Sequence, residues 1–294
     1  MRHFVYTVFL PGQKKTISIK ELYFNRYKHL VKNILNGNDS IVAEFFDDLL
    51  TDLCLEAPNV KTFSFLDKII ILLTIRAVCL SPVLELTATC PSTGNQFNNT
   101  IQISNIVDKL QNLNLPDKIY SCIKEYNNKS LIIDLGLPDT LNVKEHDLTI
   151  INTFVRKITL NSKDITDTKN EIIDHLPAYV LKDIRDYISE FNTSLKDIDL
   201  ISLQSPFAAP DTAISIPLNL FSNSVIEFLK ICFKRNLISF YEIEYFLTKE
   251  LNVSYELIKN STPAELNIYI NLYKDERAEQ EKQENKKNLN LPVR

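Results

Sequence analysis

Hydrophobic positions along this chain follow two spacings, which divide it into helical and extended stretches. Residues 22–34 carry apolar side chains at helical spacing, and residues 65–80 are apolar on nearly every side, as in a central buried helix. From Pro82 the period changes to two, which is typical of strands. We therefore expect an α+β protein that is mainly helical and carries several β-hairpins.

The expected hairpins are paired segments of alternating polarity that flank turn residues. They cover residues 3–10 with 14–20, residues 84–103, residues 119–126 with 130–137, and residues 198–221.

The expected helices have recognisable start signals. We expect them at about 22–35, 41–53, 65–80, 144–158 and 170–191, and through the last quarter of the chain. Capping boxes are predicted at Ser18/Glu21, Ser224/Glu227, Ser239/Glu242 and Thr262/Glu265, with Ser40 as a further cap and Pro263 at a first helical position.

These elements suggest three regions. Residues 1–82 form an N-terminal hairpin with helices, and residues 83–140 form a β-hairpin subdomain, to which the 198–221 hairpin is a candidate addition. Residues 141–294 form a mainly helical region that ends in a polar tail helix. Its segment 274–287 is almost wholly charged and polar, so it is either a solvated helix end or a docking tail that orders on a partner.

Composition limits the class of protein. The chain has 294 residues, of which 45% are hydrophobic, and this is enough for a sizeable core. The formal net charge is -4 and no basic stripe occurs, which disfavours a nucleic-acid partner. The apolar runs are too short for a signal peptide or a membrane span. We expect a cytosolic protein without membrane contact.

The five cysteines Cys54, Cys79, Cys90, Cys122 and Cys232 are dispersed and odd in number, so we expect reduced, buried thiols.

Two hairpin tips nevertheless resemble zinc knuckles: 90–94 (Cys-Pro-Ser-Thr-Gly) and 205–209 (Ser-Pro-Phe-Ala-Ala). The four ligand positions would be Cys90, Thr93, Ser205 and Ala208, and one thiol cannot hold structural zinc. Our hypothesis is a pair of hairpins with a ribbon-like shape and no metal. The alternatives are a chance similarity of two turns and a zinc site.

No catalytic motif occurs, so we assign no catalytic residue, cofactor or metal ligand. The carboxylate pairs Asp47/Asp48 and Glu242/Glu244 are interpreted as solvated helix faces. Arg76, inside the apolar helix, needs a carboxylate or carbonyl partner, either internally or at an interface. Core positions are expected by default for the aromatic residues at helical spacing, which are Phe45, Phe46, Phe240, Tyr241, Tyr245 and Phe246. Some of the 16 Phe and 12 Tyr must lie outside the core, and tyrosine is favoured at interfaces.

Three blocks resemble the baseplate protein family of T-even-type bacteriophages with contractile tails. They are residues 19–35 (IKELYFNRYKHLVKNIL), residues 65–97 with their helix, strand and Cys-Pro-x-x-Gly turn, and residues 261–273 (STPAELNIYINLY). Relatives of this type often carry cysteine-bearing knuckles, from which Thr93, Ser205 and Ala208 depart.

The resemblance implies a non-enzymatic subunit or assembly factor of the baseplate hub, working through protein–protein contacts. Its implied partners are other hub or wedge proteins in a symmetric assembly, with the tape-measure protein as a further candidate. The protein would occupy the host cytoplasm during assembly and the virion tail baseplate afterwards. The alternative function is a transient assembly chaperone for the tape-measure protein, absent from the mature virion. An unrecognised tail-associated hydrolase is a third possibility, for which the sequence offers no set of residues.

Overall fold

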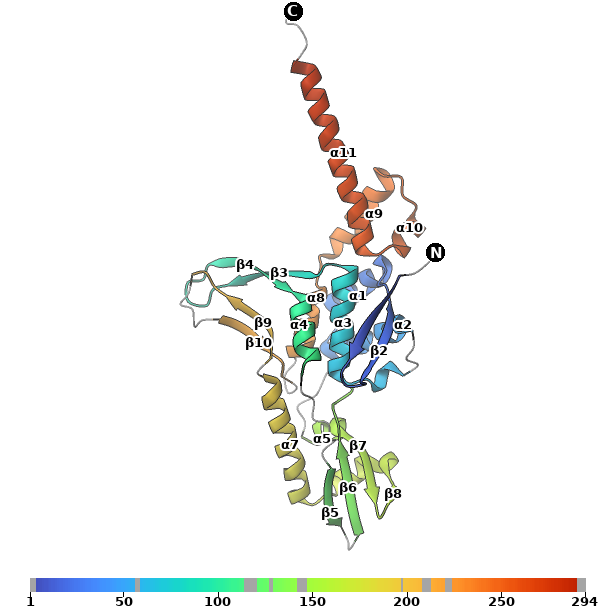
Figure 1. Cartoon of the computed structure of the whole chain (residues 1–294), viewed down its shortest axis with the longest axis vertical. Helices are drawn as coiled ribbons and strands as arrows, with labels where there is room; N and C mark the ends of the chain where they lie inside the picture. Colours follow the sequence, from blue (N-terminus) through green and yellow to red (C-terminus); the bar gives the residue numbers. More distant parts are fainter. Residues whose placement is uncertain are drawn as a thin grey trace, which may run out of the picture.

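The computed structural model describes residues 4–55, 59–113, 121–126, 129–141, 147–196, 198–207, 213–219 and 224–289, and it confirms a mainly helical α+β fold (Figure 1). The α-helices are α1 Phe24–Asn36, α2 Asp39–Leu53, α3 Phe65–Cys79, α4 Ile103–Gln111, α5 Asp147–Phe154, α6 Lys169–Asp174, α7 Ala178–Lys196, α8 Ser224–Phe233, α9 Leu237–Lys249, α10 Tyr255–Asn260 and α11 Pro263–Leu289. Short 3₁₀ turns cover Val60–Thr62 and Thr166–Thr168.

The strands form small antiparallel sheets rather than one large sheet. They are β1 Val5–Leu10, β2 Lys15–Lys20, β3 Val83–Thr89, β4 Gln96–Gln102, β5 Ser121–Tyr126, β6 Lys129–Leu135, β7 Val155–Leu160, β8 Lys163–Asp164, β9 Asp199–Gln204 and β10 Ala213–Pro217. In the described residues, β1–β2, β3–β4 and β9–β10 are separate hairpins, and β5-β6-β7-β8 form one sheet in chain order.

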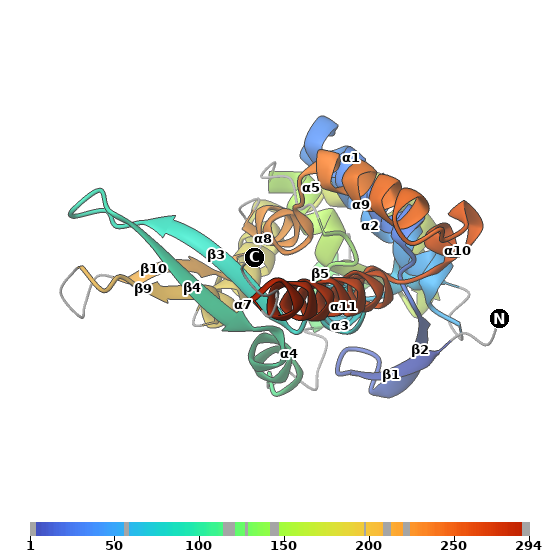
Figure 2. The same cartoon turned by 90° about the horizontal axis from the view of Figure 1, so that it is seen from above.

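Two hairpins that are far apart in the sequence lie side by side. In both views, β3–β4 and β9–β10 extend together from the helical body, and we call this pair of hairpins the arm (Figures 1 and 2). The β5–β8 sheet and α7 lie at one end of the long axis, and α11 projects at the other end (Figure 1).

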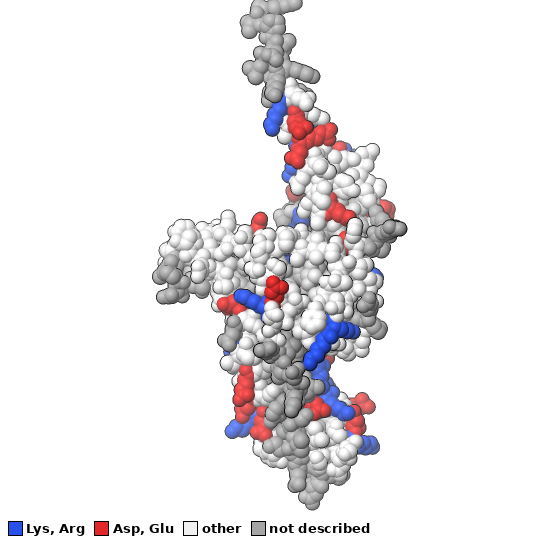
Figure 3. Space-filling model, in the orientation of Figure 1, with Lys and Arg blue, Asp and Glu red and all other residues white. Residues whose placement is uncertain are grey.

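The arm differs in charge from the rest of the surface. On the face in view, acidic and basic side chains are interspersed over the body, whereas the arm is almost uncharged (Figure 3). Within the four strands of the arm, only Glu85 and Asp199 are charged. Strand edges without charges can pair with other chains, so this surface is suited to contacts with other proteins.

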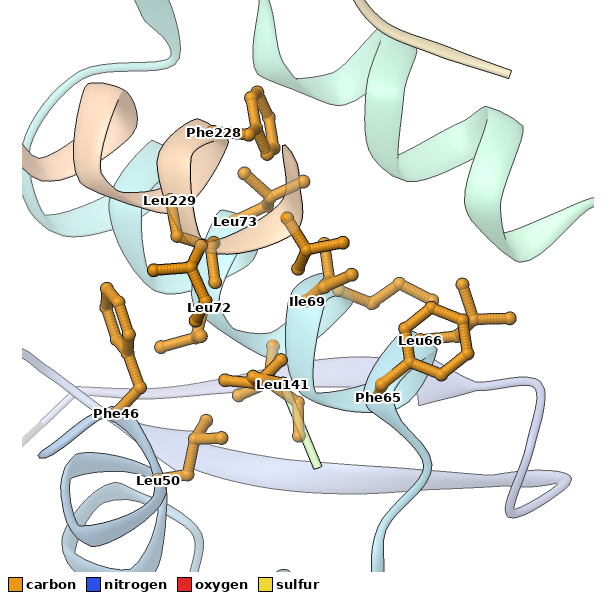
Figure 4. Packing of buried hydrophobic residues seen from close by; sticks show 14 of the residues in the cluster. Phe46, Leu50, Phe65, Leu66, Ile69, Leu72, Leu73, Leu141, Phe228 and Leu229 are labelled. Atoms are coloured by element: carbon orange, nitrogen blue, oxygen red, sulfur yellow. The ribbon is translucent and has the colours of Figure 1, made fainter. Parts of the chain in front are cut away.

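Helix α3 is the centre of the core, as its uniform hydrophobicity predicts. Ser64 caps its first turn by accepting a hydrogen bond from the Asp67 N–H at 3.2 Å. Helices α2, α4, α8 and α11 and strand β1 all pack against α3. Figure 4 shows side chains of α2 and α8 facing those of α3, and residues 69–73 of α3 have no solvent exposure. Helix α3 therefore fixes the position of the elements that surround it.

Several predicted boundaries are wrong. Ser18 lies within β2, paired with Thr7, so the Ser18/Glu21 capping box does not form. Helix α1 begins after Tyr23, which makes no side-chain cap, and Asn38 rather than Ser40 caps α2. Backbone pairing of the first hairpin replaces the helical start that the sequence suggested.

Two predicted helices are interrupted in the structure. The helix expected at 144–158 ends at Phe154, because residues 155–160 form β7 beside β6. The helix expected at 170–191 is divided into α6 and α7, with Pro177 between them. Proline lacks the N–H that helix continuation requires.

The division at residues 82 and 140 remains a prediction. Within 83–140, the structure places the β3–β4 and β5–β6 hairpins in different sheets. In the part of the chain that is described, no helix is long and apolar enough to cross a bilayer.

Candidate functional site

The first hairpin of the arm ends in a tight loop that encloses Cys90. The Cys90 N–H donates to the Asn95 carbonyl at 2.8 Å, and the Gly94 N–H donates to the Cys90 carbonyl at 2.9 Å. Gly94 has φ +72°, a left-handed conformation that favours glycine. The loop thus turns the Cys90 side chain inward, where it is 1% exposed.

The second hairpin brings Ser205 to the same place. Ser205 follows β9 and is buried, and its hydroxyl oxygen accepts a hydrogen bond from the Phe207 N–H at 3.2 Å. Ala208, the fourth position of the predicted knuckle pair, lies outside the described residues. Three of the four predicted positions can therefore be located.

Hydroxyl groups surround the sulfur of Cys90. Hydrogen bonds from Ser205, and after it from Ser92 and Thr93, lower the pKa of Cys90 to about 6. The Ser92 hydroxyl oxygen lies 3.2 Å from Cys90 Sγ. The structure thus gathers Cys90, Thr93 and Ser205, as the sequence hypothesis predicted, and adds Ser92, which that hypothesis did not include.

The donor set at the arm does not fit structural zinc. One thiol and three hydroxyls are present, whereas structural zinc takes cysteine and histidine ligands. Among the described residues, no group of three or more His, Cys, Asp or Glu side chains lies close enough to hold a metal. The hydroxyl donors can stabilise the thiolate form of Cys90, and the contact with Ser205 joins the two hairpins of the arm.

Three further cysteines have a different environment. Cys54, Cys79 and Cys232 are free and buried among apolar groups. Burial raises the pKa of Cys54 and Cys232 to about 12 and that of Cys79 to about 11. These three are thus structural thiols that stay protonated at neutral pH.

Arg76 has internal carbonyl partners. Its Nε donates to the Cys232 carbonyl at 3.0 Å, and its Nη1 donates to the Ser81 carbonyl. Burial lowers its pKa from the usual value. Of the two kinds of partner considered from the sequence, the described residues provide carbonyls and no carboxylate.

The interpretation as solvated helix faces is right for Asp48 and Glu242, which are exposed, and wrong for Asp47 and Glu244, which each pair with a buried lysine. Glu244 places both carboxylate oxygens 2.8 Å from Nζ of buried Lys28, and Asp47 pairs at 2.8 Å with Nζ of buried Lys68. Each therefore neutralises a lysine inside the protein.

Apolar side chains are exposed on the helices at the C-terminal end of the molecule. On α9, Ile238 and Tyr245 lie on one face and are 62% and 67% exposed, and on α11 Ile268 and Leu272 are similarly exposed. We call these four residues the apolar helix surface. The core position expected by default is right for Phe240 and wrong for Tyr241 and Tyr245, which are 49% and 67% exposed.

The fold and these surfaces define a class: an α+β protein with a helical core, a projecting arm of paired hairpins and exposed apolar helix faces. Comparison with protein families gives a match over residues 1–201 to the family described as T4 bacteriophage base plate protein. The chain belongs to this family, which supports a structural protein of the phage baseplate. No curated protein and no solved structure matches the chain.

Proposed function

We propose that this chain is a non-enzymatic structural or assembly protein of the baseplate hub, which acts through protein–protein contacts. The observation that carries the proposal is the combination of the family membership with the apolar helix surface and the uncharged arm. Apolar and aromatic side chains are enriched in the buried centres of protein interfaces. Exposed groups of them on two helices thus favour a role in binding other proteins.

The proposed partners are neighbouring hub or wedge proteins in a symmetric assembly, with the tape-measure protein as a further candidate. Two projecting elements, the arm and α11, support several simultaneous contacts, because they extend in different directions from the core (Figure 1). A subunit that joins neighbours needs such separated surfaces.

A transient chaperone for the tape-measure protein is the second proposed function. The same apolar helix surface favours it, because a chaperone of this kind holds apolar helices of its client. The two proposals differ in whether the protein remains in the finished particle.

Cross-linking with mass spectrometry on purified baseplates tests the proposed neighbours. We expect cross-links between lysines of this chain and proteins on the baseplate axis. Lys274 and Lys282 on α11 and Lys109 on α4 are exposed and can report on different sides of the molecule. Cross-links to peripheral wedge proteins alone would contradict the hub assignment.

A further inference from the structure

A polar pocket of about 330 Å³ lies where segments distant in the sequence meet. Its walls come from the end of α3, the start of β3, the connection between α8 and α9, and the start of α11. The charged and polar groups that line it include Arg76, Ser81, Glu85, Lys234, Arg235 and Asn267. This size is within the range of about 300–1,000 Å³ that is usual for ligand pockets.

The pocket has an excess of positive charge. Arg76, Lys234 and Arg235 line it, and Glu85 is the one acidic residue in its lining. None of the three cations has a carboxylate partner among the described residues: Arg76 donates to carbonyls, and Arg235 lies over the Phe240 ring with its guanidinium carbon 5.5 Å from the ring centroid. Within the described part of the chain, the positive charge of the pocket therefore exceeds the negative charge that lies against it.

Arg76 still has donor groups available to a ligand. Its Nε and Nη1 donate to the Cys232 and Ser81 carbonyls, and its Nη2 makes no hydrogen bond to any described residue. Arg76 is only 7% exposed, so its guanidinium is held in place by packing before a ligand arrives. A fixed guanidinium is well suited to a carboxylate, because little conformational freedom is lost on binding.

We propose that this pocket binds an acidic side chain presented by a partner protein, with Arg76 contacting the carboxylate at the base and Lys234 and Arg235 attracting it at the rim. A partner protein is favoured over a nucleic acid by two observations. The chain has a formal net charge of -4. In addition, Glu85 stands beside the three cations, so the excess positive charge of the pocket is small and suits a carboxylate better than the run of phosphates in a nucleic acid. This site rests on the proposed function, because its ligand belongs to a partner protein, but peptide binding to the isolated chain can be measured separately from any role in the baseplate.

A binding assay on the full-length chain tests the proposal, with a fluorescein-labelled hexaglutamate peptide as the probe. Fluorescence anisotropy measures its affinity for the wild type and for the double variant Lys234→Glu/Arg235→Glu. We expect the variant to bind about tenfold more weakly, because two charge-assisted contacts become repulsive. A labelled hexaglutamine peptide should not bind the wild type.

The matched control is Lys109→Glu/Lys182→Glu, which changes the net charge equally at exposed lysines on α4 and α7. It should bind hexaglutamate like the wild type. Thermal unfolding checks that each variant folds, and Lys234→Glu alone, at an exposed position, serves if the double variant does not fold. The proposal would be overturned if both double variants lost the same affinity for hexaglutamate, or if hexaglutamate did not bind the wild type. It would also be overturned if a labelled oligothymidylate bound the wild type more tightly than hexaglutamate.

Discussion

At the scale of single residues, the local environment decides the protonation of each cysteine. Cys54 and Cys232 are buried among apolar groups, which raises their pKa to about 12, whereas hydroxyl donors lower the pKa of Cys90 to about 6. The sequence hypothesis placed Ser205 near Cys90, but it did not include Ser92 or predict that hydroxyl donors would lower the pKa of the thiol. Only the pairing of the hairpins in space brings these groups together.

Replacing Ser205 by alanine should raise the pKa of Cys90, since the Ser205 hydroxyl is the largest cause of its lowering. Titration of the thiolate absorbance, with Cys90→Ser as the blank, measures this pKa. Ser202→Ala is the matched control, because Ser202 is an exposed residue of β9, the strand that precedes Ser205. An unchanged midpoint in Ser205→Ala would contradict the proposed contact.

The lowered pKa of Cys90 also determines how the stability of the folded protein changes with pH. The pKa of folded Cys90 is lowered, so the ionised form favours the folded state. The contribution of Cys90 is complete above the usual thiol pKa and is lost as the pH falls through about 6. In Ser205→Ala this loss should occur at higher pH.

Buried ion pairs are a second effect that becomes visible only in three dimensions. Glu244→Ala should lower the free energy of unfolding by about 3 kcal/mol, because Lys28 would remain buried without its partner. Urea unfolding measures the change. The control Glu242→Ala, at an exposed position of the same helix, should alter stability by less than about 0.5 kcal/mol. Similar losses in both variants would contradict the importance of the Lys28 pair.

At the scale of elements, local start signals predict only some of the helix caps. The Thr262/Glu265 capping box forms as predicted, with the Thr262 N–H 2.7 Å from Glu265 Oε2 and the Glu265 N–H 3.2 Å from Thr262 Oγ1. The Ser239/Glu242 box does not form, because Asn236 caps α9 one turn earlier. Asn236 and Ser239 are both suitable N-caps, and the sequence alone did not indicate which of them α9 uses.

Thr262→Ala should therefore destabilise the protein by about 1 kcal/mol, the usual effect of losing an N-cap side chain. Urea unfolding, read by circular dichroism, measures the loss. Thr248→Ala is the control, because the Thr248 hydroxyl only donates to the Glu244 carbonyl within α9. If the two variants lose equal stability, the capping box is not important for α11.

Strand β7 shows why periodicity failed locally. Its sequence VRKITL follows α5 directly, and a short apolar run of this kind fits a helix or a strand equally well. The choice depends on pairing with β6, whose position the sequence pattern does not give. The β3–β4 and β9–β10 hairpins were predictable, because their turns and alternation are local.

The apolar helix surface belongs to this scale as well. The double variant Ile238→Glu/Tyr245→Glu should keep its unfolding temperature, because both side chains are largely exposed. It should lower the yield of infectious particles at least about tenfold in a complementation assay, since charges at the centre of an apolar interface are strongly unfavourable. Thr248→Glu, also exposed on α9, is the control. Normal yield from the double variant would remove this surface from the proposed interfaces.

At the scale of the whole molecule, the sequence indicated the class of protein and the Cys90 cluster of the arm, but it did not indicate the pocket. Uniform hydrophobicity identified α3 as the central helix, and family blocks indicated the baseplate. The pocket was not predictable, because it joins Arg76 of α3 to Lys234 and Arg235, which follow α8. Its cations come together only through the packing of α8 against α3.

The central claim is that this chain is a lasting part of the baseplate. Quantitative mass spectrometry of purified phage particles tests it most directly, with peptides of this chain measured against those of known tail proteins. We predict a small, fixed number of copies in every tail. If the chain is absent from particles that require it for their formation, the account of a resident subunit is contradicted, and the transient chaperone function takes its place.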